Sequence, residues 1–334
     1  MRKITNRARF PVKPRSRTRW RKILAGSTLI LILSANCRMT QPTEPRPTAS
    51  PQEISTDKDP LSIHRRAIVI DLHTDTTQRL VDEQLNLGRR LSEGHFDSVR
   101  AIEGGLDAQF FSIWVEPQLF GSGGAGTIKR ADDQIAAVHR LAEQYPETWA
   151  LATSAAEIRK IASEGKLAAL MGIEGGYPID ERIENVERYY KLGVRYMSPA
   201  WSVSTSWAGS SGDQVGQSRG LNEFGKSVIR EMNRLGMMVD VSHVSDMTFW
   251  DIIGTSSKPI IATHSGCRGI ADVPRNLDDE MIKAIAKSGG VVCVLFYPAF
   301  LEPGWEEKKK QVDEQIAPLV QKASAEEPGD VAHK

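Results

Sequence analysis

Cysteine is scarce in this sequence, with only three among 334 residues. Cys37 lies near the N-terminus, which leaves Cys267 and Cys293 for the rest of the chain. Two cysteines could form a single bond in an exported protein, but they make neither a disulfide framework nor a cysteine-rich zinc motif. A metal site in this chain must therefore be built from histidine and carboxylate side chains.

An excess of positive charge is also missing from most of the chain. The net charge is +1, but residues 1–22 hold ten Lys and Arg and no acidic residue, so the remainder carries −9. An acidic body repels the phosphate backbone of DNA and RNA. The charge distribution therefore argues against a nucleic-acid partner.

The apolar run near the N-terminus is too short to span a bilayer comfortably. This run, residues 23–35 ("ILAGSTLILILSA"), has 13 residues and follows the basic head, an order typical of a secretory signal peptide. Cys37 stands where a lipoprotein cysteine would, although Asn36 is unusual before it, so lipid anchoring and ordinary cleavage both remain open. We expect an export signal at 1–37, a Pro/Thr/Ser-rich tether at 38–59, and a location in the cell envelope, in the periplasm or at the membrane.

The rest of the chain alternates short apolar runs with amphipathic segments that often end in glycine, a pattern of βα units around a parallel sheet. The sequence predicts strands at 67–72, 109–115, 167–173, 194–198, 237–242, 259–263 and 290–296. No Gly-x-Gly-x-x-Gly motif follows the first strand, which argues against a dinucleotide-binding fold. A continuous series of strands favours an α/β fold of the (β/α)8 TIM-barrel type. Because a polar stretch follows Phe300, we expect the barrel at 60–334 to be truncated before its eighth strand.

Five side chains that can bind metals lie at the ends of four predicted strands. They are His73 and Asp75 in "VIDLHTD", Glu174 in "MGIEGG", His243 in "VDVSHVS" and His264 in "IIATHSG". In a barrel of this type the catalytic side chains gather at the carboxyl ends of the strands. Residues two apart on a strand share a face, so the imidazole and the carboxylate of the first pair can reach one ion.

The joint pattern predicts a metal site, although each member has a plainer interpretation. A single histidine at a strand end is more often hydrogen-bonded and structural, and Glu174 could be a cap or a turn carboxylate. Together, the carboxylate of Glu174 could bridge two cations, with His243 and His264 on the second. Such a set of oxygen and nitrogen donors suits Zn²⁺ and, less selectively, Mn²⁺, Fe²⁺ or Co²⁺.

Several segments in this order resemble the membrane dipeptidase (renal dipeptidase) family of binuclear zinc hydrolases, which have amidohydrolase-like barrels. The resemblance covers about residues 61–302. It rests on "VIDLHTD", "GGLDAQFFSIWV", "GIEGG", "GVRYMSPAWSVSTSWAGSS", "GLNEFGKSVIREMNRLGMMVDVSHVS", "ATHSGCRGIADVPRN" and "GGVVCVLFYPAFL".

The resemblance implies a role for each matching residue. His73 and Asp75 would hold one zinc ion, His243 and His264 the other, and Glu174 would bridge both at the catalytic centre. Arg275 and Trp201 would contact the substrate. Arg275, in "VPRN", would pair with the free carboxylate of the substrate, since a guanidinium recognises a carboxylate with two parallel hydrogen bonds; otherwise it would form a surface salt bridge. Asp240 and Ser242 flank His243 and would act on it at most indirectly.

Two features depart from the family pattern. Trp201 stands where the family has a histidine that contacts the substrate, and an indole cannot exchange a proton at neutral pH. The family's eighth strand, with its Gly-x-Asp-Phe-Asp-Gly-like motif, does not occur in this sequence. The barrel as given is therefore expected to be incomplete at its C-terminal end.

Three hypotheses follow from these observations. The first is a zinc-dependent dipeptidase that hydrolyses dipeptides through a water bridging two zinc ions, with tolerance for a D-residue on the C-terminal side. The second, suggested by Trp201, is a related metal hydrolase acting on another amide or on a lactone. The third is an inactive truncated exported protein. Membrane association through the N-terminus and a homodimer both remain open.

Overall fold

A computed structural model describes residues 59–326 of the chain. The predicted export signal at 1–37 lies outside these residues, as does all of the predicted tether at 38–59 except its last residue. Within 59–326, none of the helices combines the length and the apolar character that crossing a membrane would require.

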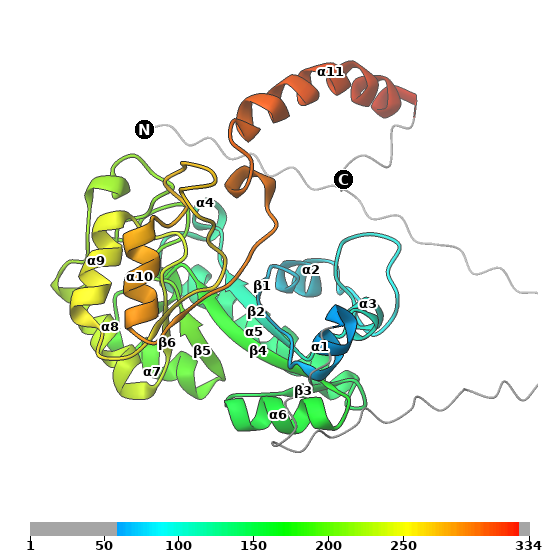
Figure 1. Cartoon of the computed structure of the whole chain (residues 1–334), viewed down its shortest axis with the longest axis horizontal. Coiled ribbons are helices and arrows are strands. Elements are labelled where there is room, and N and C mark those ends of the chain that lie inside the picture. The colour runs from blue at the N-terminus through cyan, green and yellow to red at the C-terminus, as the bar shows by residue number, and fades with distance from the viewer. Residues whose placement is uncertain (1–58, 327–334) are drawn as a thin grey trace, which may run out of the picture. The chain divides into compact units, whose positions relative to one another are not determined.

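The described residues form one eight-stranded parallel sheet that curls (Figure 1). Seven strands follow the order β1-β2-β4-β5-β6-β7-β8, and β3 pairs with β4 beside this path. Their bounds are β1 Ile70–Thr74, β2 Ala108–Trp114, β3 Trp149–Leu151, β4 Leu167–Glu174, β5 Val194–Met197, β6 Met238–Asp240, β7 Ile260–Ala262 and β8 Val291–Val292. The predicted α/β class is confirmed, because this curled half-barrel is consistent with part of a TIM-type barrel.

Each of the seven predicted strands overlaps a strand on the path, but two details differ. β3 was not predicted, because three residues give too short a run to show a period. The last strand was predicted over 290–296, whereas β8 ends at Val292. No strand of the described region pairs with the outer edge of β8, and the side chains of Val294 and Phe296 are 82% and 85% exposed. A strand buried on both faces was therefore the wrong prediction for these residues.

Helices connect the strands, and capping residues set many of their ends. The helices are α1 Pro60–Arg66, α2 Thr77–Asp82, α3 Ser98–Glu103, α4 Pro117–Phe120, α5 Gly124–Gln144, α6 Ala155–Ser163, α7 Ile183–Lys191, α8 Glu223–Leu235, α9 Asp246–Thr255, α10 Asp279–Lys287 and α11 Trp305–Glu326, with short 3-10 turns η1 Tyr177–Ile179, η2 Gly216–Ser218 and η3 Pro298–Phe300. Helix α8 is an example. At its start the Asn222 side chain accepts a hydrogen bond from the Gly225 N–H, and at its end Gly236 has a φ of 82°. Glycine adopts this left-handed conformation without strain.

The core lies on both faces of the sheet, as continuous apolar strands require. Phe111 and Met171 belong to the cluster that packs against the helices. Their chain neighbours Phe110 and Leu170 point to the opposite face and pack with Tyr196. Helix α5 packs against β2, α7 against β5, α8 against β6 and α10 against β8, and Figure 1 shows α7 to α10 together on one side of the strands. This arrangement leaves the carboxyl ends of the strands at a common edge.

One glycine links this packing to the strand ends. Gly172 on β4 is the register partner of Tyr196 on β5. A Cβ atom at Gly172 would lie 2.0 Å from the Tyr196 ring, so a larger residue would displace the ring. The absence of a side chain at this position lets the Tyr196 hydroxyl reach the middle of β1, where it donates to the Leu72 carbonyl at 3.0 Å.

Candidate metal centre

The structure brings the five predicted side chains together at the carboxyl ends of the strands. His73 lies near the end of β1 with Asp75 just beyond it, and Glu174 is the last residue of β4. His243 and His264 follow β6 and β7. Parallel strands end at the same edge of a sheet, so residues up to 191 positions apart in the sequence converge here.

Glu174 lies between two groups of imidazoles. Its side chain is 5% exposed, and its Oε2 is 3.4 Å from His73 Nε2. Its other oxygen, Oε1, is 2.8 Å from His243 Nε2 and 3.4 Å from His264 Nε2. The two carboxylate oxygens thus face different histidines, which is the geometry that a bridging ligand needs.

The other side chains of the cluster also lie close to one another. Asp75 Oδ1 lies 3.5 Å from His73 Nε2. The His73 and His264 rings stack with centroids 3.8 Å apart, and His243 Nε2 lies 2.9 Å from His264 Nε2. Ligand atoms of His73, Glu174 and His264 all lie within 4.8 Å of one another, close enough for one ion. The predicted convergence is present, and the binding of a metal by these residues stays a prediction.

The charge states of the cluster fit a cation. Burial, with the charge of Arg275, lowers the pKa of His243 to about 4, and burial, with the charge of His73, holds the pKa of His264 well below its usual range. Both rings are therefore neutral at pH 7, as metal ligands must be. Burial disfavours the charged forms of both His73 and Glu174, but the attraction between the two charges is stronger. The pKa of His73 is therefore raised well above its ordinary value, and the pKa of Glu174 is held well below its ordinary value. A bound cation would take the place of the His73 proton.

Three residues that sequence reasoning missed hold these ligands in place. The Ser112 hydroxyl on β2 donates to Glu174 Oε2 at 3.0 Å. Burial raises the pKa of Tyr196, so its hydroxyl keeps the proton that it donates to Leu72, and it can accept from His73 Nδ1 at 3.3 Å. Thr263 contacts the Nδ1 atom of His264 at 2.7 Å. A polar serine within the apolar strand "AQFFSIW" was the one signal that could have been read beforehand.

His243 is held in a strained backbone conformation. Its φ of 73° lies in the left-handed region, which residues other than glycine rarely adopt. Its carbonyl accepts hydrogen bonds from the Ser211 backbone N–H at 2.8 Å and the Ser211 hydroxyl at 3.0 Å. Strain of this kind is concentrated at functional sites, where surrounding contacts fix it.

Arg275 lies beside the cluster, and the hydrogen bonds that it makes within residues 59–326 go to uncharged groups. Its guanidinium donates to the Ser265 hydroxyl at 2.7 Å and to the His264 carbonyl at 2.8 Å. Burial lowers the pKa of Arg275 to about 10, so it stays a cation at neutral pH. The alternative of a surface salt bridge is wrong, because both of these partners are uncharged and the side chain is half-buried.

Trp201 lies beside the cluster as part of an aromatic pair. Its ring centroid is 6.3 Å from that of His243 and 4.8 Å from that of Trp114. Trp114 is the register partner of Glu174 across β2 and β4, so the pair stands next to the carboxylate. Trp114 was not predicted as a site residue.

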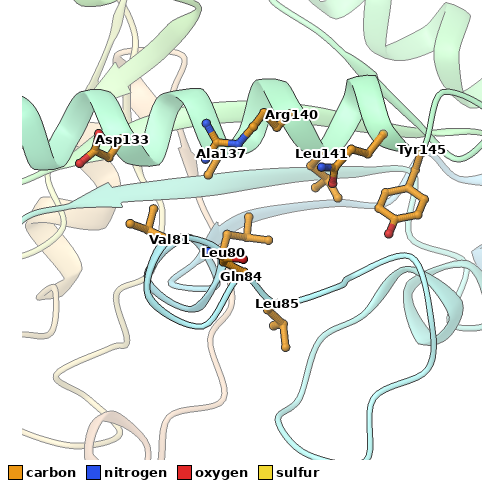
Figure 2. A pocket seen from close by; sticks show the side chains of 10 residues that line it. Leu80, Val81, Gln84, Leu85, Asp133, Ala137, Arg140, Leu141 and Tyr145 are labelled. Atoms are coloured by element: carbon orange, nitrogen blue, oxygen red, sulfur yellow. The ribbon is translucent and has the colours of Figure 1, made fainter. Parts of the chain in front are cut away.

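A cavity of about 450 Å³ lies elsewhere, between α2 and α5 (Figure 2). It is lined by Leu80, Val81, Gln84, Leu85, Asp133, Ala137, Arg140, Leu141, Gln144 and Tyr145. None of the predicted site residues is among them. The chemistry expected of this chain therefore rests on the strand ends, whose donor groups converge, and not on this cavity.

Comparison with known proteins gives consistent matches over most of the described region. The family model for membrane dipeptidase (peptidase family M19) matches residues 59–325. An uncharacterized dipeptidase of Schizosaccharomyces pombe is 32% identical over 70% of this chain and 61% of its own length. Dipeptidase 3 of Homo sapiens is 35% identical over 68% of this chain and 47% of its own length. The chain thus spans less than two thirds of either relative.

A solved structure has the same fold. It is a metallopeptidase from Rhodobacter sphaeroides with a bound phosphinate mimic of the dipeptide L-Ala-D-Ala. It superposes with a TM-score of 0.64 at 26% sequence identity, over 75% of this chain and 82% of the other.

Proposed function

The chain belongs to the membrane dipeptidase family, peptidase family M19, and from this membership we propose that it is a zinc-dependent dipeptidase. The observation that carries the proposal is the placement of Glu174, with one oxygen toward His73 and the other toward His243 and His264. The dipeptide mimic bound to the metallopeptidase of Rhodobacter sphaeroides supports a dipeptide as substrate.

Two zinc ions fit the donors that the cluster offers. His73 and Asp75 would hold one ion, His243 and His264 the other, and Glu174 would contact both. Nitrogen and oxygen donors without thiolate are common at catalytic zinc sites. Zinc ions bound there would make a water acidic and stabilise negative charge on the carbonyl oxygen of the substrate.

The surrounding residues would bind and orient the substrate. Arg275 is a half-buried cation bonded only to neutral groups, so it can receive the free carboxylate of a dipeptide with two parallel hydrogen bonds. Such a contact restricts the substrates to very short peptides. Trp201 and Trp114 would form an apolar wall against a substrate side chain. Export and lipid attachment through Cys37 remain part of the proposal on the sequence alone.

A second candidate is a metal-dependent hydrolase acting on another amide or on a lactone. Trp201 is the observation that favours it, because an indole beside His243 replaces a group that could have donated or accepted a proton. A lactone ring offers no free carboxylate, so Arg275 would then lack its proposed role.

A substrate panel separates these candidates. Zinc-loaded full-length protein is assayed on L-Ala-L-Ala, on L-Ala-D-Ala, on their C-terminal amides and on a γ-lactone, with release of amine or acid as the measurement. We expect the free dipeptides to be hydrolysed about 100-fold faster than their amides, because a charged hydrogen-bonded pair contributes about 1.5–3 kcal/mol. Faster turnover of the lactone would favour the second candidate. No turnover by protein with bound zinc would favour an inactive protein over both candidates.

A further inference from the structure

A closed hydrogen-bond network lies behind His264, between β6 and β7. Asp240 is 1% exposed and accepts three hydrogen bonds. Its Oδ1 accepts from the backbone N–H groups of Ser242 and Thr263, both at 3.0 Å, and its Oδ2 accepts from the Thr263 hydroxyl at 2.8 Å. The same hydroxyl oxygen is 2.7 Å from His264 Nδ1.

The protons of this network can be assigned one by one. With Asp240 ionised, its carboxylate only accepts, so the single proton of the Thr263 hydroxyl goes to Asp240. Ser242 Oγ accepts from the His264 backbone N–H at 3.1 Å and can donate its own proton to Thr263 Oγ1 at 3.2 Å. The Thr263 oxygen, having given its proton away, must accept from His264 Nδ1. The imidazole then carries its proton on Nδ1, and the lone pair of Nε2 can accept from His243 Nε2, which lies 2.9 Å away.

We propose that Asp240 and Thr263 are positioning residues that hold His264 in the Nδ1–H form and so present its Nε2 atom to the metal. This inference rests on the ligand role of His264 in the proposed function. It also corrects the expectation that Asp240 serves its neighbour His243, because its hydrogen bonds lead to His264 instead. His243 Nδ1 has no hydrogen-bond partner among the described residues.

The variant Asp240→Asn should reverse the donor and acceptor roles along the hydrogen bonds from residue 240 through Thr263 to His264, without changing the positions of the side chains. The two backbone N–H groups that point at Oδ1 require an oxygen there, so the amide nitrogen of asparagine must face Thr263 and donate to it. The Thr263 hydroxyl then donates to His264 Nδ1, and the imidazole proton moves to Nε2. Burial raises the pKa of Asp240, and the protonated acid would produce the same reversed order.

The first measurement reads this proton directly, in metal-free protein labelled with ¹⁵N-histidine. We expect the Nδ1–H form of His264 in the wild type and the Nε2–H form in Asp240→Asn, with the signals assigned by their loss in His264→Gln. The second measurement is zinc affinity by competition with a chelator. For one of the two ions we expect it to fall about 10–100-fold in Asp240→Asn, as is usual when a partner of a metal ligand is changed.

Thr263 provides an independent test with a matched control. Thr263→Val removes the hydroxyl at nearly constant volume and should weaken zinc binding about 10–100-fold, whereas Thr263→Ser restores the hydroxyl and should recover most of the affinity. The control is Thr127→Val, which removes a fully buried hydroxyl that donates to the carbonyls of Phe120, the last residue of α4, and Gly121. It should lower stability and leave zinc affinity unchanged.

The results separate this inference from the proposed function. A wild type that binds two zinc ions and hydrolyses dipeptides, but carries the His264 proton on Nε2 when metal-free, would overturn the network and leave the function standing. Equal zinc affinity in Thr263→Val, Asp240→Asn and the wild type would do the same. A wild type that binds no zinc would overturn both.

Discussion

Replacement of Glu174 by glutamine is expected to lower kcat/KM for dipeptides about 10³-fold or more, because bound metal ions supply several kcal/mol of charge stabilisation and each 1.36 kcal/mol is tenfold in rate. Glutamine keeps the size of the side chain but has a single oxygen and no charge. It cannot face His73 with one oxygen and His243 with the other, as Glu174 does. The measurements are steady-state kinetics and zinc content per chain, and both should fall together.

A second glutamate distinguishes this loss from a general effect of the substitution. Glu164 lies exposed at the end of α6, and Glu164→Gln should leave both kinetics and zinc content unchanged. Full activity in Glu174→Gln would contradict the proposed site. If Glu174→Gln lost activity but kept both zinc ions, only the bridging role of Glu174 would be contradicted.

Replacement of Arg275 by glutamine is expected to lower kcat/KM for a free dipeptide about 100-fold and to leave the C-terminal amide of the same dipeptide nearly unaffected. The reason is that a hydrogen-bonded charged pair contributes about 1.5–3 kcal/mol, and only the free dipeptide can form it. The wild type and the variant, each assayed on both substrates, form a thermodynamic cycle analogous to a double-mutant cycle. The cycle measures the preference for the carboxylate separately from any change in folding.

Arg268 is the matched control for this prediction. It lies in the same loop and already pairs with Asp246, at 2.8 Å from Nη1 to Oδ2, so Arg268→Gln should affect both substrates equally. An Arg275→Gln variant that loses activity on dipeptide and amide alike would contradict a carboxylate contact. It would then indicate that Arg275 supports the His264 backbone through the hydrogen bond to its carbonyl.

Much of the site could be predicted because strand ends are visible in the sequence. A run of apolar residues that stops at a histidine or a glutamate marks both a strand and the position of its end, and parallel strands bring those ends to one edge. For this reason His73, Glu174, His243 and His264 could be selected before their distances were known. That these four side chains lie close together follows from the order of the parallel strands alone.

The residues that hold the ligands could not be found in this way. Whether Thr263 meets Asp240 and His264 depends on the register between β6 and β7 and on side-chain rotamers, neither of which leaves a periodic signal. The left-handed conformation of His243 depends likewise on contacts from a distant loop.

The Tyr196 hydroxyl reaches His73 only because Gly172 leaves room beside the Tyr196 ring. This is a relation between two strands that no local sequence pattern reveals.

The most direct test of the account is the position of zinc in crystals of the full chain, located by anomalous scattering at the zinc absorption edge. The account predicts two peaks, one between His73, Asp75 and one oxygen of Glu174, and one between His243, His264 and the other oxygen. Crystals grown with zinc that show no peak at these strand ends, or a single peak with Glu174 turned away from it, would contradict the account.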